Sequence, residues 1–178
     1  HRAARKSHSE QPTVVLPVFW AGLSEHHMPF GGTITLDYDT LLSLFRCIVS
    51  SVQRHGFNKV LILNGHGGNI DACKMMAQQL SLETTDVTVV AATYWLEAQS
   101  RLEPLLEDQS NVLHAGEAET SMMMRLTPEL VDDSDLASHR TAGDLSFLLA
   151  GQASFRWRDL ASVTPNGVLV DPSTASAD

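Results

Sequence analysis

The sequence has few cysteines, few basic residues and no long apolar run. Cys47 and Cys73 are its only cysteines, and both lie in stretches with helical periodicity, so we expect reduced core thiols rather than a disulfide framework. Its 12 lysines and arginines stand against 21 aspartates and glutamates, which leaves no basic patch for nucleic acid or an anionic membrane. No apolar run approaches the ~20 residues that cross a bilayer, and no signal peptide is visible. We therefore expect a cytoplasmic protein that binds neither nucleic acid nor membrane.

Several well-known sequence motifs of enzymes are also missing. The chain has no GxSxG elbow, no Walker loop, no dinucleotide fingerprint and no CxxC pair. Serine hydrolases, nucleotide hydrolases and thiol oxidoreductases therefore have no positive support. What is present is a hydrophobic fraction of 43% in 178 residues, enough for one good core. We expect a single domain over residues 1–178.

Apolar runs and helical periodicities alternate along the first half of the chain. Residues 13–18, 59–63 and 86–93 have the composition of strands, and residues 41–52 and 70–82 have helical spacing, with a cap expected at Asp39 or Thr40. The run from Val60 to Leu63 lacks polar alternation, which favours a strand covered on both faces. This order predicts an α/β fold with a mainly parallel, helix-covered sheet.

His66 follows the second of these strands and stands among glycines in the segment NGHGGN, residues 64–69. Open α/β sheets bind ligands beyond the carboxyl ends of their strands, so His66 is a candidate metal ligand or general base. A hydrogen-bonded loop histidine is the alternative. The loop after the first strand adds His26 and His27, of which we expect one to face the site and the other to face solvent.

Two further candidates lie together near a predicted helix that starts at Ala115. Glu119 shares a helical stripe with Met122, Met123 and Leu126, and a buried carboxylate needs a cation, a metal or a protonated neighbour. A partly exposed salt bridge is the alternative. His114 precedes the helix and is a candidate ligand, general base or cap. Glu117 lies on another face, where the helix dipole favours a carboxylate.

Metal-assisted hydrolysis is the reaction class that remains once the missing motifs are taken into account, and these residues suit it. In such a reaction a metal-activated water attacks a carbonyl, and a histidine or glutamate moves protons. Trp95, at the end of the third strand, is a candidate wall for a flat substrate, although core packing is equally consistent with its position. Asn69 lies near the start of a predicted helix.

Three segments together resemble the creatininase (creatinine amidohydrolase) family. They are residues 64–69, residues 27–36 (HMPFGGTITL) and residues 114–121 (HAGEAETS). The resemblance extends over roughly residues 13–130 and more weakly to the end of the chain. It implies a three-layer α/β/α sandwich with a mainly parallel sheet, and a two-metal site of zinc or manganese. The implied reaction is hydrolysis of a non-peptide C–N bond in an amide, formamide or cyclic amide.

The resemblance also implies roles for individual residues. His66 would be a metal ligand, Glu119 a ligand of the second metal and part of the catalytic pair, and His114 the proton-handling residue. His27, Trp95 and Asn69 would contact a small-molecule amide substrate. Family members often form hexamers, so a homo-oligomer is implied. The alternatives are a peptidase, like the member that acts in mycofactocin maturation, and a non-catalytic member that binds a small ligand or a partner.

The chain departs from creatininases proper at several positions. Those enzymes carry a glutamate where this chain has Gly68, a tryptophan where it has Ser110 and a glutamate where it has Leu113, so creatinine is not the expected substrate. The family also has an N-terminal strand and helix that carry a Glu-x-His pair and an aspartate, and a C-terminal helix after the segment that matches Asp171. We find neither in residues 1–178, and expect that the chain corresponds to the middle of a family member.

Overall fold

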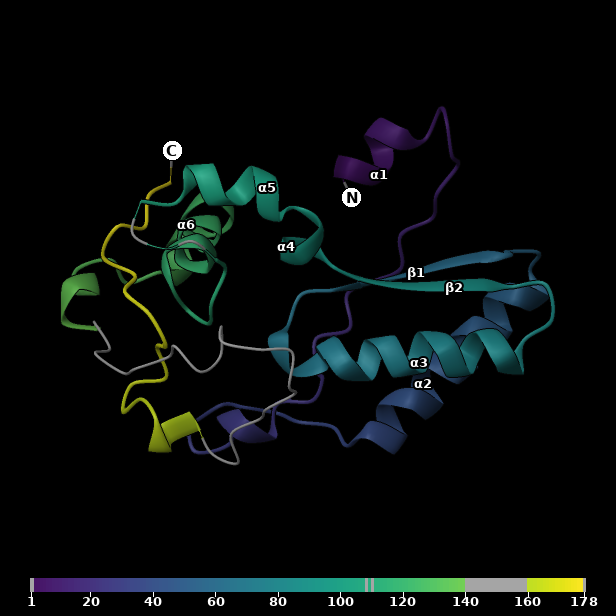
Figure 1. Cartoon of the computed structure of the whole chain (residues 1–178), viewed down its shortest axis with the longest axis horizontal. Coiled ribbons are helices and arrows are strands. Elements are labelled where there is room, and N and C mark those ends of the chain that lie inside the picture. The colour runs from purple at the N-terminus through teal and green to yellow at the C-terminus, as the bar shows by residue number, and fades with distance from the viewer. Residues whose placement is uncertain (1, 108, 110, 140–159, 178) are drawn as a thin grey trace.

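The computed structural model describes residues 2–107, 109, 111–139 and 160–177. Its sheet consists of β1 (Lys59–Asn64) and β2 (Thr88–Thr93), which run parallel with Asn64 opposite Thr93. α3 (Ile70–Glu83) connects the two strands, and α2 (Tyr38–Arg54) precedes β1. Figure 1 shows α2 and α3 on the same side of the strand pair. The predicted α/β class and the parallel pairing are therefore confirmed.

The ends of α2 follow from local sequence. The side chain of Asp37 accepts a hydrogen bond of 2.7 Å from the backbone N–H of Thr40, which satisfies a donor that the first helical turn leaves free. The cap is thus Asp37 and not Asp39 or Thr40, so our expectation was two or three residues late. Gly56, with φ of +86°, follows the end of the helix, because glycine adopts this conformation without strain.

The main core lies between the two helices and one face of the sheet. Ile62 is 6% exposed in the middle of β1, whereas its neighbours Leu61 and Leu63 are 61% and 65% exposed. The prediction that both faces of this strand are covered is therefore wrong for the described residues, in which helices pack on one face. The buried core residues are Leu41, Leu42, Val49, Ile62, Cys73, Met76, Ala77, Leu80, Val87 and Val89.

Two other sequence expectations also need correction. Residues 13–18 form no strand, because a strand needs a partner for its backbone groups and, among the described residues, the nearest pairing is a single parallel bridge from Gly22 to Thr35. Val14, Leu16 and Val18 are exposed as a result. Of the two cysteines, Cys73 is buried as expected, but Cys47 is exposed.

The second half of the described chain is built from short helices around a smaller apolar cluster of Trp95, Val112 and Ala118. Within the described residues, no helix has both the length and the apolar content needed to cross a membrane. The remaining α-helices are α1 (Arg2–Ser7), α4 (Tyr94–Glu97), α5 (Gln99–Leu102) and α6 (Glu117–Leu126). The 3-10 turns are η1 (Glu25–His27), η2 (Gly67–Asn69), η3 (Glu103–Leu105), η4 (Pro128–Leu130), η5 (Leu136–His139) and η6 (Leu160–Ser162).

Candidate active site

The position of His66 is fixed by the last residue of β1. The buried side chain of Asn64 accepts a hydrogen bond from the backbone N–H of His66 at 3.0 Å and donates to the backbone carbonyl of His66 at 2.9 Å. The same amide donates to the hydroxyl of Thr93 on β2 at 3.1 Å. Asn64 therefore ties the histidine loop to both strands of the sheet.

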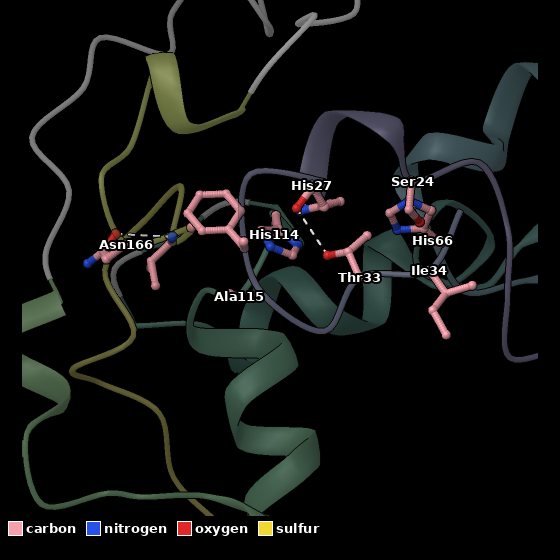
Figure 2. A pocket seen from close by; sticks show the side chains of 11 residues that line it. Ser24, His27, Thr33, Ile34, His66, His114, Ala115 and Asn166 are labelled. Carbon is pink, nitrogen blue, oxygen red and sulfur yellow. Dashed lines mark hydrogen bonds between the residues drawn. The ribbon is translucent and has the colours of Figure 1, made fainter. Parts of the chain in front are cut away.

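The loop that carries His26 and His27 is held against the histidine loop. The side-chain oxygen of Asn69 accepts a hydrogen bond from the backbone N–H of Leu23 at 2.8 Å. The backbone N–H of Ser24 donates to the hydroxyl of Thr35 at 2.9 Å. The hydroxyl of Thr33 donates to the carbonyl of His27 at 3.0 Å, as Figure 2 shows. These bonds order the loop on either side of η1.

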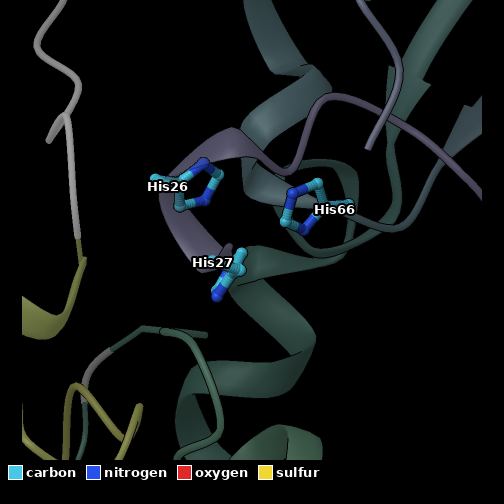
Figure 3. Close-up of side chains that lie close together, drawn as sticks. All are labelled: His26, His27 and His66. Carbon is cyan, nitrogen blue, oxygen red and sulfur yellow. The ribbon is translucent and has the colours of Figure 1, made fainter. Parts of the chain in front are cut away.

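Three imidazoles converge at the junction of these loops (Figure 3). The rings of His26 and His66 are stacked, with centroids 5.5 Å apart and an interplanar angle of 9°. The ring of His27 lies 4.2 Å from that of His26 and 5.5 Å from that of His66, centroid to centroid. One ring nitrogen from each of the three lies within 4.8 Å of the other two. Both neighbouring histidines thus join His66, whereas we expected one to face solvent.

His114 extends the cluster from the other half of the chain. Its ring centroid is 4.4 Å from that of His27, and its Nδ1 is 4.0 Å from Oε2 of Glu119. The same carboxylate oxygen accepts a hydrogen bond of 2.8 Å from the backbone N–H of Ala115. The backbone carbonyl of His114 accepts a hydrogen bond from the N–H of Leu169 at 3.3 Å. The expected proximity of His114 and Glu119 is confirmed.

Burial controls the protonation of these groups. Burial, together with the smaller effect of the neighbouring imidazoles, lowers the pKa of His27 and of His114 to about 4. Burial raises the pKa of Glu119, and the hydrogen bond from Ala115 acts in the opposite direction. Because the ordinary pKa of histidine is already below 7, the rings of His27 and His114 are neutral at pH 7. Each then has a nitrogen lone pair that can accept a proton or bind a metal.

A cavity of about 500 Å³ lies beside the cluster (Figure 2). Three of the histidines that the sequence singled out, His27, His66 and His114, line this cavity. Phe30 also lines it and packs against Gly167, from a distant part of the sequence: a Cβ at Gly167 would lie 3.5 Å from the ring. The complete lining is Ser24, His27, Phe30, Thr33, Ile34, His66, His114, Ala115, Asn166, Gly167 and Val168.

Trp95 and Asn69, the other candidates from the sequence, are not among the residues that line the cavity. Trp95 is 8% exposed and packs in the smaller apolar cluster. Asn69 holds the loop at Leu23. Ser110, one of the departures from creatininases, lies outside the described residues, whereas Leu113 immediately precedes His114.

The carboxylates of α6 differ from the sequence interpretation. Glu117 is 3% exposed, and its Oε1 accepts a hydrogen bond of 2.7 Å from the backbone N–H of Glu107. We expected it to be an ordinary carboxylate of the first helical turn. The stripe assigned to Glu119 is also not buried, because Met123 and Leu126 are 42% and 71% exposed. Helical spacing located Glu119 correctly near His114 but did not predict which side of α6 faces the protein.

The fold and the cavity define an α/β protein whose histidines gather at the carboxyl ends of parallel strands. The family model described as "Creatininase: Creatinine amidohydrolase" matches residues 1–178. The chain belongs to the creatininase family.

Similar proteins of known sequence include both peptidases and amidohydrolases. A mycofactocin precursor peptide peptidase of Mycobacterium ulcerans is 30% identical over 164 residues, which is 92% of this chain and 58% of that protein. A creatinine amidohydrolase of Pseudomonas putida is 28% identical over 123 residues, which is 64% of this chain and 47% of that protein. The chain thus spans less than two thirds of the length of these relatives.

Solved structures show the same fold. A putative creatinine amidohydrolase from Bacteroides fragilis superposes with a TM-score of 0.80 at 28% identity, over 98% of this chain and 68% of that one. A creatininase variant described as the Zn–Zn type has a TM-score of 0.59 at 26% identity, over 83% of this chain and 59% of that one.

Proposed function

We propose that this chain forms the centre of a metal-dependent hydrolase that cleaves an amide bond in a peptide. The observation that carries the proposal is the convergence of His26, His27, His66 and His114 beside one cavity at the ends of β1 and β2. Imidazoles in a cavity at this position suit both metal binding and proton transfer.

The residues present fit a zinc-type metal. Imidazole nitrogen is a preferred ligand of zinc, and three such nitrogens lie close together. His66 is our proposed ligand, and Glu119 our proposed ligand of a second metal in the full-length protein. When bound, such a metal polarises an amide carbonyl and lowers the pKa of water. A relative of the Zn–Zn type supports zinc, with manganese as the alternative.

His114 is the proposed proton carrier. Its ring lines the cavity and is neutral at pH 7, so a ring nitrogen can take a proton from the attacking water and return it to the leaving amine. Oε2 of Glu119, fixed by the N–H of Ala115, lies 4.0 Å from Nδ1 of His114. A modest movement of either side chain would let the carboxylate orient the imidazole and stabilise it once it is protonated.

The comparisons favour a peptide substrate over a small non-peptide amide. The relative named a peptide peptidase matches 92% of this chain, whereas the creatinine amidohydrolase matches 64%. Gly68 and Leu113 also stand where creatininases proper are expected to carry glutamates. A small formamide or cyclic amide is the second candidate, supported by the creatinine amidohydrolase match. His27, Asn69 and Trp95 remain our proposed substrate contacts.

The remaining family features are also proposals for the full-length protein. The exposed face of β1 at Leu61 and Leu63 suits the second helical layer of a three-layer sandwich. Homo-oligomeric assembly and a cytoplasmic location are likewise proposed from the resemblance and the composition.

The test is hydrolysis by the full-length protein of a peptide panel, a formamide panel and creatinine. His114→Gln should lower kcat by about 10²–10⁴-fold, the usual contribution of a general acid–base. His55→Gln, at an exposed site after α2, is the control and should keep full activity. His66→Ala and Glu119→Gln should each lose at least one metal per chain. If wild-type protein hydrolyses nothing in the panels and needs no metal, the non-catalytic binding alternative replaces this proposal.

A further inference from the structure

We propose that Phe30 and the turn of residues 164–168 form a subsite for an uncharged, apolar side chain next to the amide bond to be cleaved. This preference rests on the proposed function, because it concerns the peptide substrates of the same cavity. Figure 2 shows Asn166, in the turn, at one end of the lining residues and His66 at the other, with His114 between them. The turn therefore lies away from the proposed metal ligand.

The turn is held in shape by its own hydrogen bonds. The side-chain oxygen of Asn166 accepts one from the hydroxyl of Thr164 at 2.7 Å and one from the backbone N–H of Val168 at 3.2 Å. Thr164 is fully buried. Gly167 has φ of +80°, a conformation that glycine adopts without strain. Asparagine followed by glycine suits such a turn, because the asparagine side chain bonds to the backbone two residues further on.

Phe30 lies against this turn. A Cβ on Gly167 would lie 3.5 to 3.6 Å from three atoms of the phenyl ring, so the bare glycine backbone packs next to the far end of the ring. The backbone N–H of Phe30 donates to the carbonyl of His27 at 2.9 Å, which fixes the other side of the contact. Phe30, Gly167 and Val168 all line the cavity. The ring and the turn thus form one wall of the cavity.

This wall is close to the proposed proton carrier. The backbone N–H of Leu169, which follows the turn, donates to the carbonyl of His114 at 3.3 Å. Consecutive Cα atoms of a peptide are about 3.8 Å apart, so a side chain that flanks an amide bond at His114 is within reach of the wall. A cavity of about 500 Å³ has the size of a small-molecule pocket. It therefore encloses the residues around one amide bond and not a long peptide.

The composition of the lining selects against charge. In the described part of the chain, none of the residues that line the cavity is an aspartate, glutamate, lysine or arginine. The rings of His27 and His114 are neutral at pH 7, because burial and the neighbouring imidazoles lower their pKa values to about 4. A charged side chain in the subsite would lose hydration without gaining a partner of opposite charge. An apolar side chain would bury its surface against Phe30 and Val168.

The first test is cleavage of matched peptides by the full-length protein. The peptides share one sequence and differ only beside the scissile bond, where the residue before or after it is leucine, alanine, lysine or glutamate. On one side of the bond, kcat/KM should be at least about 10-fold higher for leucine than for either charged residue, since even one methylene in an apolar pocket discriminates by ~10–200-fold. Equal values for all residues on both sides would overturn the subsite and leave the proposed hydrolase standing.

Two substitutions change the wall in different ways. Val168→Asp places a carboxylate in the subsite, so the preference should shift from leucine toward lysine by at least about 10-fold. Phe30→Trp fills part of the subsite, so cleavage of the leucine peptide should fall relative to that of the alanine peptide. Leu130→Asp, at a 70% exposed position, is the control for added charge and should keep the wild-type preference.

Each of these results is a ratio between two peptides cut by the same protein, so partial misfolding of a variant does not produce it. A fall by one common factor for every peptide would show that Phe30 and Val168 support the fold without contacting the substrate. That outcome would overturn the subsite.

A binding measurement decides the case in which no peptide is cleaved. N-acetyl-leucinamide and N-acetyl-lysinamide are titrated into the full-length protein, and their affinities are measured by NMR. The leucine compound should bind at least about 10-fold more tightly, and Val168→Asp should reduce that ratio. Equal affinities in a protein that cleaves no peptide would overturn the subsite together with the proposed function. Preference for the leucine compound in such a protein would overturn the proposed function and keep the subsite.

Discussion

At the scale of single residues, Asn64 connects the sheet to the loop that carries His66. Its buried amide serves the two backbone groups of His66 and the hydroxyl of Thr93. We predict that Asn64→Ala lowers the free energy of unfolding by about 1–3 kcal/mol, because the backbone N–H of His66 loses its buried partner. Zinc affinity should fall as well, since the loop of His66 is no longer held.

Thr93→Val is the control for this prediction. It removes the side-chain hydrogen bond from Asn64 to Thr93 and leaves both bonds from Asn64 to His66 in place. Its effect on zinc affinity should be small, while chemical denaturation should still show a loss of stability. Equal loss of zinc affinity in the two variants would mean that Asn64 acts through the sheet and not through the loop.

Some residues of the site could be predicted from the sequence and others could not, and the difference has physical reasons. His66 could be predicted because it follows an apolar strand and stands among glycines. His114 and Glu119 could be predicted because they lie five residues apart, on either side of the start of a helix. His26 could not be assigned, because two adjacent histidines face one side only when a tight turn such as η1 carries them. The burial of Glu117 could not be predicted either, because its carboxylate accepts a hydrogen bond from the backbone N–H of Glu107. That contact joins residues ten positions apart, and no periodicity in the sequence indicates it.

At the scale of elements, only one face of β1 is covered among the described residues. Substitutions at neighbouring positions, whose side chains point to opposite faces of the strand, can test this. We predict that Ile62→Ala lowers the free energy of unfolding by about 2–5 kcal/mol, since the side chain is 6% exposed in the core. Leu63→Ala, at 65% exposure, should stay within about 0.5 kcal/mol of wild type. Chemical denaturation of the 178-residue chain measures both values. Similar losses at the two positions would show that the second face is also packed.

The N-terminal cap of α2 gives a pH dependence whose sign is fixed. Hydrogen bonds from Thr40 lower the pKa of Asp37 below its ordinary value of 3.8. Because the pKa of this carboxyl group is lower in the folded chain than in the unfolded chain, the cap stabilises the folded chain at pH values above 3.8. The stabilisation is lost as the pH falls through the lowered pKa of the folded chain. Asp37→Ala should therefore lower the thermal midpoint near pH 6 and have no effect at the acid end.

Asp37→Asn is the matched control for this cap. Asparagine caps helices about as well as aspartate but does not titrate, so its midpoint should fall less steeply with acid than that of wild type. Thermal unfolding between pH 2 and pH 7 distinguishes the three proteins. A constant difference between wild type and Asp37→Ala over this range would contradict the assigned role of the carboxylate.

The elements themselves were predictable wherever local periodicity decides them. α2, α3 and the two paired strands lie within a few residues of their predicted bounds, because their apolar spacing matches the surface that they bury. Residues 13–18 have the composition of a strand yet pair with no strand among the described residues. Strand formation requires a neighbour, and its presence is a property of the tertiary structure rather than of the segment.

At the scale of the whole molecule, the same uncovered sheet face predicts how the chain behaves in solution. Leu61, Leu63 and Val90 are each at least half exposed on β1 and β2, and monomeric proteins rarely leave large contiguous apolar patches in water. We predict that the 178-residue chain self-associates reversibly at micromolar concentration. Sedimentation velocity over a range of concentrations measures this.

Charge on that face should reverse the association. The double variant Leu61→Lys and Leu63→Lys should sediment as a monomer, because two ammonium groups on each copy repel and cannot be buried together. It should still bind zinc, since neither side chain lies among the imidazoles or lines the cavity. Leu82→Lys, at an 88% exposed position near the end of α3, adds charge elsewhere and should leave association unchanged. If Leu82→Lys disperses the chain as well as the double variant does, net charge controls association and the sheet face has no part in it.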